Sequence, residues 1–229
     1  MSTPRRRHPA KDELFEALAR PAKALASARR VELLDLLAQA PRTVEVLAAE
    51  SSMSMANTSQ HLQVLRSAGL VTSDKAGLHV TYRLVSPAVH ALVVALRSVA
   101  ERHVAELAEV KRSLSLDAAD VIAVSGKELL RRARAAEVVL LDVRPREEFD
   151  AAHLPHAISV PVDELARRVG ELPRGADVVA YCRGPYCVYA AEAVRLLRRR
   201  GFRAFRLEDG VPEWRARRLP LVSPEEELR

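Results

Sequence analysis

The chain has 229 residues, of which 48% are hydrophobic and 29% are charged, and its formal net charge is +6. This composition is typical of folded globular proteins and excludes a largely disordered chain. No apolar run reaches the roughly 18 residues that span a membrane, and no apolar segment follows the basic N-terminus as in a secretion signal. We therefore expect a cytoplasmic protein of two domains, because this length is large for one.

The positive charge is uneven along the chain. Residues 1–115 carry 16 Lys and Arg against 11 Asp and Glu, whereas residues 116–229 carry 20 against 19. A basic first half beside a nearly neutral second half indicates an anionic partner for the first half, such as nucleic acid. Residues 1–11 are predicted to form a flexible basic tail.

Helical periodicity begins after this tail. Residues 12–37 are predicted to form two helical pieces broken near Pro21, with Ser27 capping the second piece. Thr43 is predicted to cap a short helix that ends at residue 50. After a break at residues 51–52, Ser54 is expected to cap another helix, which ends at Gly69.

A short helix, a tight turn and a second helix have the spacing of a helix-turn-helix. Residues 70–72 and 79–84 are then predicted to be two short strands around a turn, which would complete a winged helix. A long helix is predicted from Ser86 to about Leu114. Its apolar stripe is too wide for a lone surface helix, so we expect it to pack against a partner subunit in a homodimer.

The pattern changes after residue 115. Residues 116–125 are predicted to be a linker between a domain at 12–115 and a domain at 126–229. In the second domain, strands alternate with helices, which predicts an α/β domain with a central parallel sheet. The predicted strands are 138–143, 177–181 and 202–207, and the predicted helices are 127–135, 163–169, 188–200 and 212–217.

The run from Ser59 to Val71 resembles the helix-turn-helix of the ArsR family of bacterial repressors. The resemblance rests on His61-Leu62, Val64-Leu65 and Ala68-Gly69-Leu70-Val71. With the wing, the resemblance covers about residues 12–110. It implies a dimeric transcriptional regulator, most simply a repressor, bound to near-palindromic operator DNA. Short polar side chains at the start of a recognition helix and cations on the wing suit base and phosphate contacts. The predicted DNA-binding residues are Ser54, Asn57, Thr58, Ser59, Gln60, His61, Lys75, His79 and Arg83.

Metal sensing occurs in many ArsR-like proteins, but the ligand pattern is incomplete in this sequence. Val44–Ala48 stands where the family carries Cys-x-Cys. His90, His103 and Glu106 partly match a second ligand set, but Leu92 occupies a position where a ligand would be expected. We predict no metal site and no cofactor.

The second half contains four ordered motifs similar to those of rhodanese domains. They are residues 140–149, 153–161, 178–187 and 208–214, and the resemblance covers about residues 120–222. It implies that Cys182 carries a persulfide and that Arg183, Gly184, Pro185, Tyr186 and Cys187 form the active-site loop. Gly184 is followed by Pro185, whereas many rhodaneses place the loop glycine one position later.

The residues themselves support Cys182 as the nucleophile. It ends a predicted buried strand shortly before a helix, so loop N–H groups, the helix N-terminus and the adjacent Arg183 should all favour its thiolate. Cys187 is either a resolving thiol that attacks an oxidised or persulfidated Cys182, or a small residue at the helix start. Asp142 and Arg144 are interpreted as a structural ion pair, and His153 as a residue that fixes its loop.

Three functions are consistent with these motifs. The first is a regulator that senses reactive sulfur or redox state through Cys182. The second is an active sulfurtransferase, using thiosulfate or a persulfide as donor, with an autoregulatory DNA-binding domain. The third is a non-catalytic rhodanese fold that serves as a ligand or partner module, against which the intact Cys182 argues. Residues 114–125 are the candidate element for coupling the two domains.

Overall fold

The computed structural model describes residues 8–77, 79–114, 116 and 120–224. The chain divides into two compact units, Met1–Val93 and Val94–Arg229. This division lies within a helix, N-terminal to the predicted linker at 116–125, of which residues 117–119 are outside the described part. No helix in the described residues is long and apolar enough to cross a membrane.

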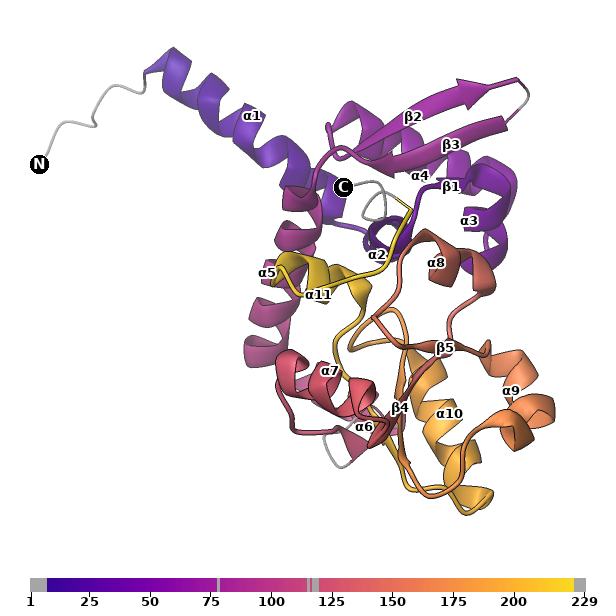
Figure 1. Cartoon of the computed structure of the whole chain (residues 1–229). Coiled ribbons are helices and arrows are strands. Elements are labelled where there is room, and N and C mark those ends of the chain that lie inside the picture. Colours follow the sequence, from indigo (N-terminus) through magenta and orange to yellow (C-terminus); the bar gives the residue numbers. More distant parts are fainter. Residues whose placement is uncertain (1–7, 78, 115, 117–119, 225–229) are drawn as a thin grey trace, which may run out of the picture. The chain divides into compact units, whose positions relative to one another are not determined.

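The first unit is a winged helix-turn-helix, as predicted from the sequence (Figure 1). Its strands form an antiparallel sheet in the order β1-β3-β2, in which the β2–β3 hairpin is the wing. The elements are α1 (Pro9–Leu25), α2 (Ala28–Gln39), β1 (Arg42–Thr43), α3 (Val44–Glu50), α4 (Met55–Ser67), β2 (Val71–Ala76), β3 (His79–Leu84) and the first part of α5 (Pro87–His103).

Two of the three capping predictions of this unit are confirmed, whereas Ser27 stands at the N-cap position of α2 but its side chain makes no capping hydrogen bond. The Thr43 hydroxyl accepts a hydrogen bond from the N–H of Val46 at the start of α3, and the Ser54 hydroxyl accepts one from Asn57 at the start of α4. Each side chain thereby satisfies one of the N–H groups that a helix start leaves unpaired. Helices α2, α3 and α4 and the sheet enclose a core built around Leu33, Leu34, Leu47, Leu62 and Leu65.

Two helix predictions need correction. Helix α1 starts at Pro9, inside the predicted tail, and Pro21 lies within it. A proline removes only one intrahelical hydrogen bond, so α1 continues to Leu25, where the Arg30 guanidinium bonds the Lys23 carbonyl at 3.3 Å and also that of Ala24. The long helix predicted from Ser86 is two helices, α5 and α6 (Ala105–Ser113), separated by extended backbone at Val104.

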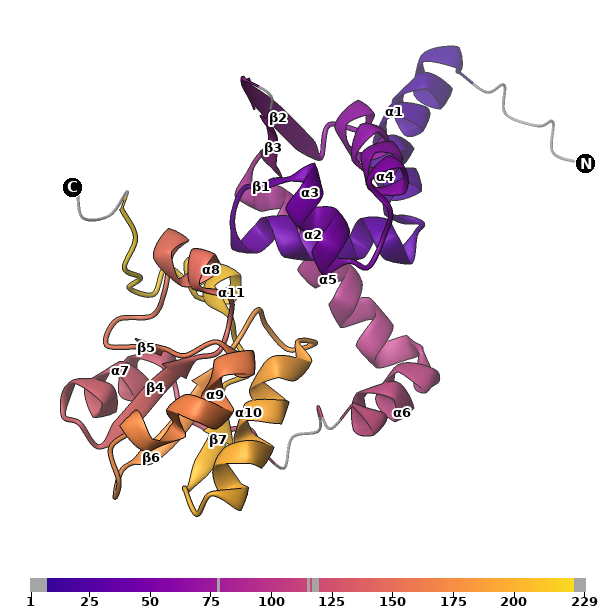
Figure 2. The same cartoon turned by 90° about the vertical axis from the view of Figure 1, so that its right-hand side faces the viewer.

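The second unit contains the predicted α/β domain, with a four-stranded parallel sheet in the order β5-β4-β6-β7 (Figure 2). Its elements besides α6 are α7 (Gly126–Arg134), β4 (Val138–Asp142), α8 (Arg146–Ala151), β5 (Ile158–Ser159), α9 (Val162–Arg168), a 3₁₀ turn (Val169–Glu171), β6 (Asp177–Tyr181), α10 (Val188–Arg199), β7 (Ala204–Arg206) and α11 (Val211–Ala216). The short α8 and β5 were not predicted.

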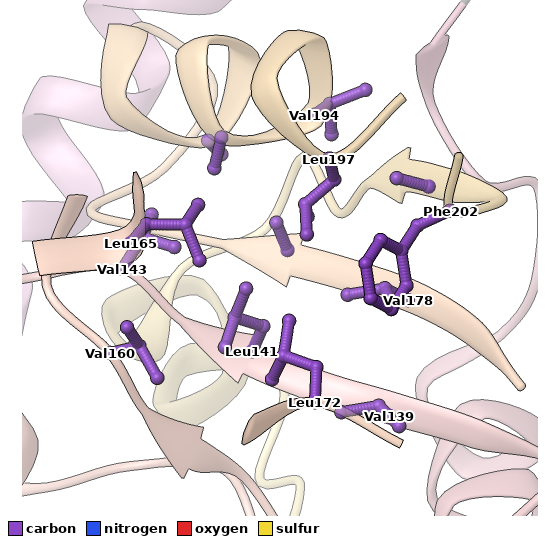
Figure 3. Packing of buried hydrophobic residues seen from close by; sticks show 14 of the residues in the cluster. Val139, Leu141, Val143, Val160, Leu165, Leu172, Val178, Val194, Leu197 and Phe202 are labelled. Carbon is purple, nitrogen blue, oxygen red and sulfur yellow. The ribbon is translucent and has the colours of Figure 1, made fainter. Parts of the chain in front are cut away.

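The sheet is covered on both faces, which explains why its central strands are apolar without alternation. Leu141 and Val178 point to the face covered by α9 and α10, where they pack with Leu165 and Leu197 (Figure 3). Leu140, Val179 and Tyr181 belong to the opposite face, with Leu129 of α7 and Trp214 of α11. Successive residues of a strand thus enter two different cores.

Candidate functional site

The loop of residues 182–187 joins the central strand β6 to helix α10. Because β4 and β6 are parallel neighbours, the residues that follow both strands lie at the same edge of the sheet. This carboxyl edge is where open α/β sheets bind their ligands. The loop therefore lies where a reactive site is expected, and it places both cysteines of the chain together.

Two glycines define the shape of this loop. Gly184 has φ of +136°, and a Cβ on it would lie 3.2 Å from a carboxylate oxygen of Glu213. Gly210, from the fourth rhodanese-like motif, packs so closely on the loop that a Cβ would lie 2.7 Å from the carbonyl oxygen of Arg183. Both positions require glycine, the first for its backbone angle and the second for the close approach.

The two thiols differ in their exposure. Cys182 is 2% exposed, and its Sγ donates to the backbone oxygen of Cys187 at 3.5 Å. Cys187 is half-buried and occupies the N-cap position of α10. Both are free thiols, so the structure represents the reduced pair.

The electrostatics of the pair differ from the sequence expectation for Cys182. Burial raises the pKa of Cys182 well above its ordinary value, despite the N–H groups of Ala190 and Gly184 that bond its sulfur. The pKa of Cys187 is lowered, first by the hydrogen bond from the Cys182 thiol and then by N–H groups of the loop and helix start and by the charge of Arg183. The two opposite shifts of the pKa favour a thiolate on Cys187 over one on Cys182.

The side chain of Arg183 binds a buried carboxylate. Its guanidinium donates to Glu148 Oε1 through Nε at 2.8 Å and Nη2 at 2.5 Å, and both side chains are buried. Glu148 also lies 3.9 Å from Arg144, which forms a fully buried ion pair with Asp142 at 2.6 Å. The sequence predicted the ion pair of Arg144 and Asp142. It did not predict the role of Glu148, because α8 was not recognised as a helix. The signal that could have found Glu148 is its place within the first rhodanese-like motif.

His153 lies in the loop that follows α8. Its ring stacks on Phe149 with the centroids 3.7 Å apart, and Nδ1 is 2.8 Å from the Phe149 carbonyl oxygen. Its backbone also pairs with Val222. These contacts agree with the interpretation that His153 fixes its loop.

In the first unit, α4 presents most of the predicted DNA-binding side chains to solvent. Ser54, Asn57 and Gln60 are exposed, and Ser59 and His61 are half-buried. Thr58 is fully buried, and its hydroxyl donates to the Ser54 carbonyl at 3.0 Å. The hydroxyl of Thr58 thus holds the first turn of α4, which removes it from the surface that DNA could touch.

The wing carries the predicted cations on its two strands. Lys75 and Arg83 are exposed, and Arg83 Nε bonds Asp74 at 3.0 Å. The backbone of His79 pairs with Ala76 at the tip, while the side chain of His79 is outside the described part of the structure. Exposed ion pairs are weak, so Arg83 can exchange Asp74 for a phosphate at little cost.

A groove of about 680 Å³ lies between α1 and α4 of the first unit. Arg20 and Lys23 line its α1 side, and Gln60 and Gln63 line its α4 side. No sequence pattern places these two cations beside α4, because α1 and α4 are distant along the chain and only the packing brings them together. Among the described residues, no group of three or more His, Cys, Asp or Glu side chains is placed to hold a metal ion.

Comparisons with known proteins match both halves of the chain. Residues 27–73 match the family of bacterial regulatory proteins named arsR, and residues 125–217 match the rhodanese-like domain. The chain is 44% identical over 216 residues to the HTH-type transcriptional regulator Rv0324 of Mycobacterium tuberculosis, covering 92% of each chain. It is 33% identical over 96 residues to a sulfurtransferase of Allochromatium vinosum, covering 42% of this chain and 88% of that protein.

A solved structure is similar to the first unit. It is the homodimeric winged helix-turn-helix DNA-binding domain of Mb0332 from Mycobacterium bovis, described as a possible ArsR-family transcriptional regulator. The sequence identity is 36%, the TM-score is 0.41, and the match covers 46% of this chain and 95% of that one.

Proposed function

Because the chain belongs to the ArsR-type helix-turn-helix regulators that carry a C-terminal rhodanese-like domain, we propose that it is a transcriptional repressor that senses reactive sulfur or redox state through a persulfide on Cys182. The proposal that the protein senses sulfur or redox state rests on one observation. Cys182 and Cys187 lie together in one loop at the carboxyl edge of the sheet. The regulator acts in the cytoplasm, on operator DNA.

The thiol pair provides the steps of such a reaction. The Cys187 thiolate takes the proton of Cys182, and the resulting Cys182 thiolate attacks the sulfane sulfur of a donor such as thiosulfate. The S–S bond of thiosulfate breaks, sulfite leaves, and Cys182 holds a persulfide. Loop N–H groups that bond the Cys182 sulfur suit the anionic persulfide equally well.

Cys187 then acts as the resolving thiol. The proton that Cys187 took from Cys182 moves to the outer sulfur, the Cys187 thiolate attacks the Cys182 sulfur, a Cys182–Cys187 disulfide forms, and hydrosulfide leaves. Recovery of the reduced pair requires two electrons from a cellular dithiol. The loop would thus alternate between a dithiol, a persulfide and a disulfide.

The DNA-binding half acts as a homodimer with two recognition helices. Leu14, Phe15 and Leu18 of α1 and Leu92 of α5 are exposed at 56%, 57%, 63% and 39%, an apolar surface that a second copy would cover. We propose that Ser54, Asn57, Ser59, Gln60 and His61 contact bases and nearby phosphates. Lys75, Arg83 and His79 of the wing, with Arg20 and Lys23 beside the groove, contact the backbone.

The test uses the full chain and a duplex selected from random-sequence DNA for binding to it. Titration with inorganic polysulfide or thiosulfate should change the DNA affinity by about fivefold or more, the lower range of allosteric couplings. Cys182→Ser should abolish this response and keep the basal affinity. A response of equal size in Cys182→Ser would sink the sensing mechanism.

A second function, sulfur transfer with turnover, is favoured by the similarity to the sulfurtransferase of Allochromatium vinosum. In this alternative the Cys182 persulfide is attacked by cyanide or an acceptor thiol, and the DNA-binding unit controls expression of the protein's own pathway. Thiocyanate formation from thiosulfate and cyanide, dependent on Cys182 and sustained over many cycles, would support it. Formation of a single equivalent would support sensing instead.

A further inference from the structure

Tyr186 lies in the loop between the two thiols and contacts residues outside the rhodanese-like match. Its ring centroid is 4.8 Å from the guanidinium carbon of Arg97 and 5.6 Å from Nζ of Lys111. Its hydroxyl donates to Oε1 of Glu101 at 3.1 Å, and Lys111 bonds the same carboxylate oxygen at 2.9 Å. All four residues belong to the compact unit that begins at Val94.

Arg97 reaches the loop by a second route, through Glu213. Its Nη1 lies 3.3 Å from Oε1 of Glu213, and each side chain is only 10% exposed. Glu213 accepts a hydrogen bond from the N–H of Gly210 at 3.0 Å, and its carboxylate lies against Gly184. Arg97 therefore contacts Tyr186 directly and Gly184 through one carboxylate.

Helix α5 presents this contact on one side only. Arg97 and Glu101 are four residues apart, so they lie on the same face of α5. Leu92, Leu96 and Val99 follow a separate stripe on the opposite face and are exposed at 39%, 41% and 59%. One helix thus holds the sulfur loop on one face and offers an apolar stripe to solvent on the other.

We propose that Arg97 and Glu101 are positioning residues of the sulfur site, and that α5 braces the loop of residues 182–187 through Tyr186 and Glu213. Reaction at the thiol pair changes the loop, and the brace passes the change to α5. This second step rests on the proposed function, whereas the brace itself does not. The coupling element is then α5 rather than residues 114–125, of which 115 and 117–119 lie outside the described structure.

The brace is tested by the reactivity of Cys182, which the closed loop shields. In full-length Arg97→Met, iodoacetamide should alkylate Cys182 about fivefold faster than in the parent protein, as expected for loss of about 1 kcal/mol of loop closure. Tyr186→Phe keeps the ring against Arg97 but loses the bond to Glu101, so a smaller increase is expected. Arg97→Lys should recover part of the parent rate, because it keeps the charge opposite Glu213.

Arg102→Met is the matched control, because Arg102 is an exposed arginine on the same helix. Alkylation is followed by mass spectrometry of the Cys182 peptide, and hydrogen exchange of residues 94–103 and 183–187 is measured on the same samples. Diamide oxidation of the pair should change exchange in residues 94–103 of the parent protein but not of Arg97→Met. Equal alkylation rates in Arg97→Met and Arg102→Met would overturn the brace. A confirmed brace without any persulfide on Cys182 would refute the proposed function alone.

Discussion

Replacing Gly210 by alanine should disturb the sulfur loop without touching a thiol. The added Cβ would lie 2.7 Å from the carbonyl carbon and oxygen of Arg183 and 2.8 Å from the oxygen of Cys182. Ordinary contact begins near 3.4 Å, so one backbone must retreat by about 0.7 Å. The atoms on both sides are main chain, and no flexible side chain can absorb the displacement. Overpacking of this kind costs about 1–3 kcal/mol of unfolding free energy.

The single tryptophan of the chain provides the assay. Trp214 is fully buried in α11, so its fluorescence follows the unfolding of the second unit alone. With an m-value of about 2 kcal/mol/M, the predicted loss lowers the urea midpoint by about 0.5–1.5 M. Gly170→Ala is the matched control, because a Cβ there meets no heavy atom within 4 Å.

The substitution should also raise the alkylation rate of Cys182. The backbone that must move includes the carbonyl group of Cys182, so its movement should expose the thiol. A urea midpoint and an alkylation rate equal to those of Gly170→Ala would refute the reasoning. The close approach of residue 210 to the loop would then have no energetic consequence.

Three further predictions concern the thiols, the charge network and the DNA interface. Cys187→Ser should move the pH midpoint for alkylation of Cys182 to lower pH, because the hydrogen bond to Cys187 and its charge both raise the pKa of Cys182 in the parent protein; an unchanged or higher midpoint would contradict this. Glu148→Leu should lower the unfolding free energy by about 3–5 kcal/mol in urea denaturation, since it takes the carboxylate partner from the buried guanidinium of Arg183, whereas the exposed Asp150→Ala should cost less than about 1 kcal/mol. Asn57→Ala should weaken binding to the selected duplex by about 1–3 kcal/mol and leave binding to random DNA unchanged. Lys75→Ala should weaken binding to both duplexes and reduce the slope of log affinity against log salt concentration by about one. The same loss on both duplexes for Asn57→Ala would exclude base contact.

Much of the fold follows from local sequence patterns. The caps at Thr43 and Ser54 mark helix starts, and each hydroxyl accepts the expected backbone hydrogen bond. The apolar runs 138–142 and 177–181 indicate strands buried on both faces, and the parallel sheet follows from their alternation with helices. These predictions succeed because the interactions lie within a few residues of each other.

Errors in the predicted elements have identifiable causes. Helix α8 lies inside the first rhodanese-like motif, at 140–149, where only the strand was predicted. Helix α1 passes through Pro21, which removes only one intrahelical hydrogen bond, and it ends where Arg30 of the next helix bonds the Lys23 carbonyl. The break at Val104 lets Lys111 of α6 bond Glu101 of α5, a contact that no periodic pattern encodes.

By itself, the sequence determined the two domain types, the DNA-binding helix and the loop that carries both cysteines, because motifs and periodicity are local properties. Only the tertiary structure decided how the site is arranged. It buried Thr58, paired Arg183 with Glu148, and brought Arg97 to Tyr186 across 89 positions of sequence. It also shifted the pKa of the two thiols in opposite directions, because a pKa depends on burial and on neighbours in space rather than along the chain.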